Sequence, residues 1–160
     1  MSAADTRPRQ NTRRSDNDDF RLVALLLSIS KSTRALTGLK LAEMGFHNGQ
    51  DELLLALDEE EPVSVSRLAD ELRVRPSTVS KMLDRLVGKG LMERMLDKRD
   101  ARRTMVRITP AGLDARSELL EMRMLLEGEL TAMLPEGSDA VTALLESVAT
   151  LLSARLSRLR

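Results

Sequence analysis

The 160-residue sequence contains no cysteine, tryptophan or tyrosine, and its only aromatic side chains are those of Phe20 and Phe46. The absence of cysteine excludes disulfide bonds and thiol-based redox sensing, and it removes the thiolate ligands of most structural zinc sites. With a single histidine in addition, we expect neither a metal nor a cofactor. Leucine and methionine must fill the core, because 42% of the residues are hydrophobic. A chain of this length predicts one domain, or one domain with a helical extension.

The sequence also lacks a long apolar run. The longest run, Leu22–Leu27, is far shorter than the roughly 20 apolar residues that a membrane-spanning helix needs. Three aspartates lie just before it, which is the wrong flank for a signal peptide. We therefore expect a soluble cytoplasmic protein with no membrane partner.

Groups of residues suited to catalysis are equally scarce. The one dense carboxylate run, Asp58–Glu61, precedes Pro62 at the end of a predicted helix and has no histidine beside it in the sequence. An enzyme needs a nucleophile, an acid–base pair or a metal cluster. We interpret this run as a solvated helix end, and the sequence predicts that the protein is not an enzyme.

Residues 64–88 have the pattern of two short helices joined by a turn. Ser64 is suited to cap the first helix. Pro76 suits the first turn of the second helix, because the backbone N–H group that proline lacks would have no partner within the helix at that position. Apolar residues at helical spacing predict the buried stripe of that helix: Val79, Met82, Leu83 and Leu86. The opposite face carries small hydrogen-bond donors and cations: Ser77, Thr78, Lys81 and Arg85.

A strand–tip–strand pattern follows the second helix. Gly90 lies at the end of that helix, and Leu91–Leu96 and Thr104–Ile108 are predicted strands separated by a charged tip. Val63 is expected to add a short strand that pairs with this hairpin. Two helices joined by a turn and followed by a basic hairpin predict a winged helix-turn-helix, mainly α with a small β wing. This arrangement is typical of DNA-binding modules.

Charge is sorted along the chain although the total is neutral. The whole sequence has 25 basic and 25 acidic residues. Residues 64–110, however, include 12 lysines and arginines but only 6 aspartates and glutamates. Such a local basic excess is expected where a module contacts phosphates. A solvated surface with a chance imbalance is the alternative interpretation.

Long helical patterns flank the winged region. Residues 19–44 are predicted to form one helix, and residues 110–134 a second. In a last helix, over residues 138–159, leucine and valine recur at nearly heptad spacing. These apolar stripes would be left uncovered in a monomer, so we expect the flanking helices to form a symmetric homodimer. A monomeric helical bundle is the alternative.

The sequence thus divides into four parts. These are a disordered arm at 1–18, an N-terminal dimerisation helix at 19–45, a winged helix-turn-helix domain at 46–110 and C-terminal dimerisation helices at 111–160. A short helix at Asp51–Leu57 is expected near the start of the winged domain. The arm mixes arginine with aspartate, a composition that favours an idle tail over contact with a DNA minor groove.

Taken together, these motifs closely resemble the MarR family, the multiple-antibiotic-resistance-type transcriptional regulators. The resemblance is carried by residues 68–72, 77–86, 90–94, 97–102 and 108–112. Its most specific part is the Asp-x-Arg-Asp-x-Arg wing tip, followed by a Thr-x-x-Gly helix start. The resemblance is strong over about Gly45 to Leu113 and rests on helix order elsewhere. It implies a homodimer with intertwined terminal helices, in which two winged domains straddle a palindromic operator.

The predicted DNA-binding residues come from the second helix, the turn before it and the wing: Arg75, Ser77, Thr78, Ser80, Lys81, Arg85, Arg99, Arg102 and Arg103. Arg75 is placed to hold a phosphate at a helix N-terminus, and Arg99 resembles the family's minor-groove arginine. Asp97, Asp100 and Arg102 are expected to pair with one another and shape the loop. The sequence leaves open which residues read bases and which contact phosphates.

The resemblance also implies a small effector. Members of the family bind phenolic or anionic molecules near the junction of the dimer helices and the winged domain, which makes Phe46, His47 and Gln50 candidates here. A capping or interdomain hydrogen bond is the alternative role for this junction. The function predicted is that of a repressor released from its operator by a small aromatic or anionic effector. An effector-independent nucleoid or protein-interaction module is the alternative.

Overall fold

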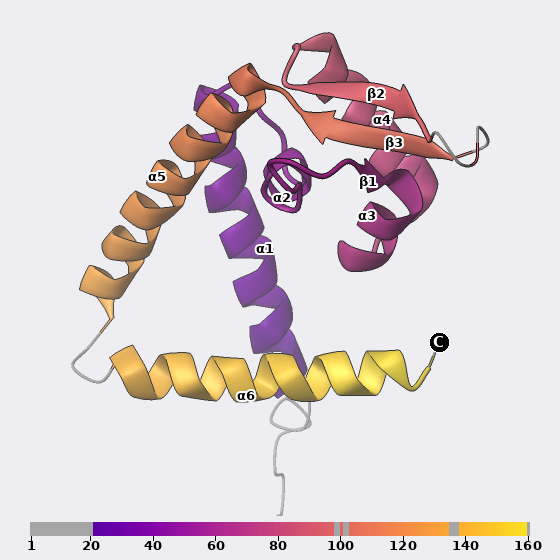
Figure 1. Ribbon diagram of the computed structural model, residues 1–160. Helices are drawn as coiled ribbons and strands as arrows, with labels where there is room; N and C mark the ends of the chain where they lie inside the picture. The colour runs from indigo at the N-terminus through magenta and orange to yellow at the C-terminus, as the bar shows by residue number, and fades with distance from the viewer. Residues whose placement is uncertain (1–20, 98–99, 101–102, 135–137, 160) are drawn as a thin grey trace, which may run out of the picture. The chain divides into compact units, whose positions relative to one another are not determined.

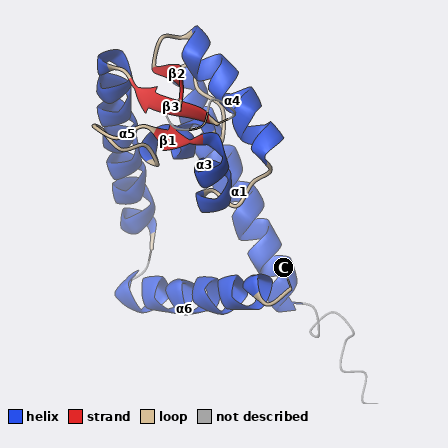
Figure 2. Ribbon diagram, turned by 45° about the vertical axis from the view of Figure 1, so that its right-hand side comes forward, coloured by secondary structure: helices blue, strands red, loops and turns tan. Residues whose placement is uncertain are grey.

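The computed structural model describes residues 21–97, 100, 103–134 and 138–159. These residues form helices and one small antiparallel sheet (Figure 1; Figure 2), which confirms the mainly α class with a β wing. The elements in chain order are α1 (Arg21–Glu43), α2 (Gln50–Leu55), β1 (Val63–Ser64), α3 (Val65–Glu71), α4 (Pro76–Gly88), β2 (Met92–Leu96), β3 (Thr104–Ile108), α5 (Pro110–Met133) and α6 (Ser138–Ser157).

The N-terminal unit is α1 with the connection that follows it. After the helix ends, Gly45 adopts a left-handed backbone with a φ of 74°, a conformation that glycine reaches without a Cβ penalty. The N–H of Phe46 then donates to the carbonyl of Leu41 at 2.8 Å, which satisfies a carbonyl left over at the helix end. The break predicted at Gly45 is therefore present.

The connection after Gly45 is held against α1. The side-chain amide of Asn48 donates to the carbonyl of Arg34 at 3.2 Å. A Cβ atom on Gly38 would lie 2.7 Å from that amide nitrogen, so glycine leaves the space that Asn48 occupies. The chain divides into its two compact units between Asn48 and Gly49, three residues later than the boundary expected after residue 45. The predicted 1–18 arm lies outside the described residues.

The second unit begins with α2 and continues into the helix-turn-helix. Helix α2 spans Gln50–Leu55, shifted toward the N-terminus relative to the expected Asp51–Leu57. Ser64 caps α3 as predicted, because its Oγ accepts a hydrogen bond from the N–H of Arg67 at 3.2 Å. Helix α4 starts with Pro76 in its first turn. Its buried face holds Val79, Leu83 and Leu86, which are fully buried, whereas the fourth predicted member, Met82, is half-buried.

The sheet has the strand order β1-β3-β2, and both pairings are antiparallel. Val63 pairs with Val106, as the expected short strand requires. Met92 pairs with Ile108 at the base of the hairpin, and Leu96 pairs with Thr104 next to its tip. The second predicted strand is observed at its predicted bounds, and the first starts one residue late, at Met92.

The start of α5 is fixed to the end of α4. Thr109 caps α5 by accepting from the N–H of Gly112 at 3.1 Å, and its hydroxyl donates to the carbonyl of Gly90 at 2.6 Å. A Cβ atom on Gly112 would lie 2.0 Å from the carbonyl oxygen of Leu91, a separation that no real side chain tolerates. The Thr-x-x-Gly motif therefore has a local steric and hydrogen-bonding cause.

The long helices expose many large apolar side chains. On α6 these include Leu144, Leu145, Leu151, Leu152 and Leu156, and several leucines of α1 are exposed to a similar degree. By length and composition alone, α1 and residues Asp139–Ser157 are long and apolar enough to cross a membrane. One or two such helices are weak evidence of membrane insertion.

Candidate nucleic-acid interface

Helix α4 presents a polar and basic face opposite its buried stripe. Burial of the apolar stripe fixes the rotation of the helix about its axis, so the side chains opposite it must face solvent. Five of the predicted contact residues on and before this helix are exposed: Arg75, Ser77, Thr78, Lys81 and Arg85. The sixth, Ser80, is half-buried. Arg75 occupies the N-cap position with an extended backbone and no capping bond from its side chain.

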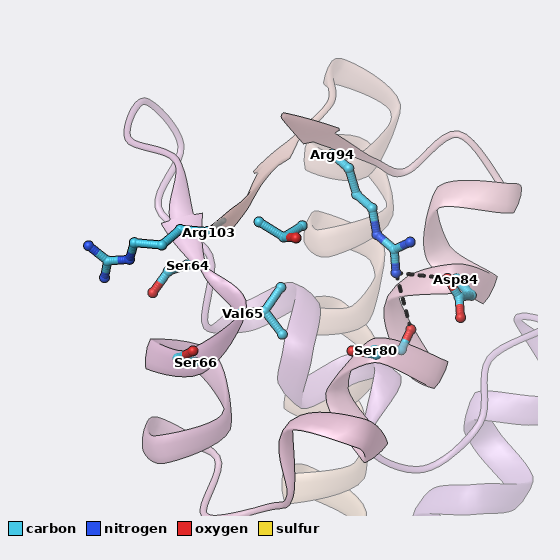
Figure 3. Close-up of a pocket in the computed structure, with 8 residues that line it drawn as sticks. Ser64, Val65, Ser66, Ser80, Asp84, Arg94 and Arg103 are labelled. Atoms are coloured by element: carbon cyan, nitrogen blue, oxygen red, sulfur yellow. Dashed lines mark hydrogen bonds and ion pairs between the residues drawn. The ribbon is translucent and has the colours of Figure 1, made fainter. Parts of the chain in front are cut away.

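A polar hollow of about 400 Å³ lies between α4, the start of α3 and the wing strands (Figure 3). Its lining is almost wholly polar or charged: Ser64, Val65, Ser66, Ser80, Asp84, Arg94, Arg103 and Thr104. Figure 3 shows the Arg94 side chain extending from β2 toward α4, while the guanidinium of Arg103 points away from it. The hollow thus separates two cationic side chains at the edge of the α4 face.

One ion pair connects the wing to α4. Arg94 Nη2 donates to Asp84 Oδ1 at 2.7 Å and approaches the carbonyl of Ser80 at 3.4 Å. This contact neutralises the one acidic side chain of α4, a helix that otherwise carries Lys81 and Arg85. Sequence reasoning missed both partners as site residues. Asp84 lies on a helix and Arg94 on a strand ten residues later, and no helix or strand periodicity predicts a contact between two such positions.

The wing tip is held partly by Arg103. The N–H of Asp97 donates to the Arg103 carbonyl at 3.2 Å, and the N–H of Arg103 donates to the Asp100 carbonyl at 2.9 Å. The Arg103 guanidinium lies 4.0 Å from the Asp97 carboxylate, and the Arg103 side chain is 58% exposed. Arg103 is thus one partner of Asp97, and the expected pairing of Asp97 and Asp100 with Arg102 stays a prediction. Residues Lys98, Arg99 and Arg102 lie outside the described residues.

The three candidate effector residues differ in exposure. Phe46 and Gln50 are buried, with 4% and 2% of their surface exposed, whereas His47 is exposed. Phe46 and His47 belong to the N-terminal unit, and Gln50 is the first residue of α2 in the second unit. His47 is the candidate whose side chain is open to solvent.

The carboxylate run after α2 forms a turn. Asp58 Oδ1 accepts from the N–H groups of Glu60 and Glu61, both at 2.8 Å. These bonds, with that of Glu61 the strongest cause, lower the pKa of the Asp58 carboxyl. Glu59 pairs with Arg116 of α5. The run thus stabilises a loop, and among the described residues no three histidine, aspartate or glutamate side chains are grouped to hold a metal ion.

Comparison with known proteins gives matches in both sequence and structure. A model of the MarR family matches residues 48–104, which cover α2 to the start of β3. A curated riboflavin kinase from Thermococcus kodakarensis is 33% identical over 82 residues, which are 48% of this chain. The chain spans only 37% of that protein's length.

Solved structures match over most of this chain. The transcriptional regulator BldR from Sulfolobus solfataricus is 26% identical with a TM-score of 0.71, over 88% of this chain and 99% of that chain. A MarR variant from E. coli, solved with operator DNA, is 25% identical with a TM-score of 0.71, over 84% and 99%. The S. aureus MepR–DNA complex, at 23% identity and a TM-score of 0.71 over 82% and 96%, shares the fold.

Proposed function

Because this chain belongs to the MarR family, we propose that it regulates transcription by binding a palindromic operator as a homodimer. The structural relative from E. coli is complexed with operator DNA, which supports double-stranded DNA as the ligand. The observation that carries the proposal is the α4 face, where Lys81 and Arg85 are exposed opposite the buried apolar side chains of the same helix. A helix of this kind fits the major groove of B-DNA.

Each contact residue has a role suited to its chemistry. Lys81 and Arg85 offer cations that bind phosphates or guanine, and Ser77 and Thr78 offer small donors to bases or backbone. Arg75 lies at the N-terminus of α4, where the helix dipole also favours a phosphate. Arg99, Arg102 and Arg103 of the wing are assigned to the adjacent minor groove and its phosphates.

The homodimer is supported by the uncovered helices. Leu144 and Leu151 on α6, and Leu159 just after its end, are 65%, 70% and 71% exposed in the single chain. Exposed apolar surface of this extent marks an interaction site on a soluble protein. A second copy covers it and places two α4 helices in a two-fold arrangement, which matches a palindromic site.

Regulation by a small molecule completes the proposal. We assign a small aromatic or anionic effector to the region of Phe46, His47 and Gln50, where the chain passes from the N-terminal unit to the second. A ligand that prefers the arrangement unable to bind DNA would release the protein, and a repressor would thereby be relieved. We assign the protein to the cytoplasm. No catalytic activity is proposed, because the match to the kinase covers a minor part of that enzyme.

A selection experiment tests the function. The protein selects duplexes from a randomised pool, and its affinity for a selected duplex is then compared with that for a random duplex of equal length. We expect a palindromic consensus and an affinity ratio of ~10³ or more, the lower range for specific binders. Equal affinity for both duplexes would favour the effector-independent nucleoid module.

A further inference from the structure

Helix α2 is attached to α5 by arginines at both of its ends. At the N-terminal end, Arg123 Nη2 donates to Asp51 Oδ2 at 2.7 Å. The other oxygen of this carboxylate, Oδ1, accepts from the N–H of Gly49 at 3.0 Å. Only 4% of the Asp51 side chain is exposed, whereas 43% of Arg123 is exposed. Both oxygens of a buried carboxylate are thus bonded, one to the chain entering α2 and one to α5.

At the C-terminal end of α2, Arg116 forms the second attachment. Its Nη1 donates to the carbonyl of Leu57 at 3.1 Å, and its Nη2 pairs with Glu59. The Arg116 side chain is 17% exposed, although it is an arginine on a long helix with many exposed positions. The guanidinium therefore bonds a backbone carbonyl just past α2 and a side chain in the turn that follows.

The spacing of the two arginines matches the length of α2. Arg116 and Arg123 lie seven residues apart on α5, which is about two turns and ~10.5 Å along one face. The six residues of α2 span ~9 Å. One helix face therefore holds both ends of the other helix. Because α2 also packs against α4, these contacts connect α5 to the proposed DNA-reading helix.

Ionic attachment does something that apolar packing alone does not. A leucine interface tolerates small rotations and slides, whereas paired charges and charge-assisted hydrogen bonds are satisfied in one geometry. A buried ion pair adds little net stability over an apolar replacement, so its main effect here is on orientation. Two such attachments at opposite ends of α2 prevent it from pivoting on either one.

We propose that Arg116 and Arg123 are positioning residues that fix the winged domain on α5 and thereby set the half-site spacing that the dimer accepts. This inference rests on the proposed function, in which α5 belongs to the dimer framework and α4 reads DNA. One inserted base pair rotates a half-site by about a tenth of a turn and moves it along the axis. Two rigidly held winged domains bind a duplex with altered spacing more weakly, whereas loosened domains can adjust to it and lose less affinity.

The test measures spacing preference separately from affinity. A duplex selected by the wild-type protein is remade with one or two base pairs inserted or deleted at its centre. Dissociation constants are measured for the wild type, Arg123→Gln, Arg116→Gln and Asp51→Asn. Asp51→Asn keeps an acceptor for the Gly49 N–H while removing the negative charge that holds Arg123, so it tests the same ion pair from its other partner. Arg107→Ala is the matched control, because it removes an arginine–glutamate pair with Glu93 that lies within the wing.

We expect the wild type and Arg107→Ala to bind the parent spacing at least ~10-fold more tightly than the altered ones, a ratio typical of structural coupling. In the variants of Arg116, Arg123 and Asp51 this ratio should fall to ~3-fold or less. The fall should come from a higher affinity for the altered duplexes relative to that for the parent duplex. An unchanged ratio in folded variants, with or without a lower melting temperature, would overturn the inference. Failure of the wild type to select any two-half-site duplex would instead overturn the proposed function.

Discussion

Arg94 in β2 and Asp84 in α4 form an ion pair, with Arg94 Nη2 at 2.7 Å from Asp84 Oδ1. The two side chains are 40% and 61% exposed, so the pair contributes little to stability. Its effect is on the proposed interface, because it holds the wing against α4 and offsets the acidic side chain beside Lys81 and Arg85. Removing either partner should change DNA binding more than folding.

Arg94→Ala should therefore weaken operator binding by ~10-fold while moving the free energy of unfolding by less than ~1 kcal/mol, the range for exposed pairs. The variant leaves the Asp84 carboxylate uncompensated close to the DNA phosphates. Asp84→Ala combined with Arg94→Ala should recover part of the affinity, since the repulsive charge is then gone. Fluorescence anisotropy and thermal unfolding on the same samples measure both quantities. Equal loss in the single and double variants would show that Arg94 itself contacts DNA.

Lys81→Ala and Arg85→Ala should lower operator affinity and its salt dependence. Each phosphate contact contributes a slope of about −0.9 to the plot of log affinity against log salt. A variant that loses a phosphate contact should have a slope shallower by about 0.9, whereas one that loses a base contact keeps the slope and loses discrimination. Arg99→Ala, at the wing tip, should weaken binding with little change in melting temperature. Salt-insensitive binding by the wild type would contradict the assignment of this face.

Gly112→Ala should destabilise the fold by ~2 kcal/mol or more, as expected when a side chain is forced into occupied space. Its Cβ would lie 2.0 Å from the Leu91 carbonyl oxygen. Gly128→Ala is the control on the same helix, because nothing lies within 4 Å of the added atom. That variant should be neutral or more stable by up to ~1 kcal/mol, from helix propensity. Chemical denaturation of both variants measures the difference, and equal stabilities would contradict the packing described.

His47→Ala should reduce the release of DNA by an effector while leaving DNA binding without effector nearly intact. Phe46→Ala is a less clean variant, because Phe46 is 4% exposed and its loss should cost ~3 kcal/mol or more of stability. A panel of small aromatic carboxylates and phenols titrated into the operator complex measures release. An effector that releases wild type and His47→Ala equally would place its site elsewhere.

The local elements of this fold follow from short sequence patterns. Ser64 and Thr109 cap helices because their hydroxyls reach an N–H three residues ahead, and Pro76 starts α4 for reasons internal to one turn. The period of Val79, Leu83 and Leu86 sets which face of α4 is exposed. These interactions span a few residues, so the sequence alone predicts them.

Contacts between distant residues were not predicted. Arg116 and Leu57 are 59 residues apart, and Arg123 and Asp51 are 72 apart, so no spacing rule pairs them. Arginine, asparagine and aspartate have many possible partners in a sequence, and the tertiary fold selects one.

Leu152→Asp should prevent the chain from forming a stable dimer. Leu152 is 54% exposed in the single chain and lies on the apolar stripe of α6. An isolated carboxylate in an apolar interface is costly to bury, so association should be lost. Thr150→Asp is the control on the same helix, because the helical period places Thr150 on the face opposite that stripe and its side chain is exposed. Light scattering at micromolar concentration gives the two masses, and a Leu152→Asp protein that remains dimeric would place the interface on other residues.

The most direct measurement is the mass of the protein and of its complex with a selected duplex, by native mass spectrometry. The free protein should have the mass of two 17.8 kDa chains, and the complex should contain two chains on one duplex. A random duplex of the same length, present in equal amount, should remain free of protein at physiological salt. A single chain in solution, or equal occupancy of selected and random duplexes, would contradict the proposal of a homodimer that recognises a palindromic operator.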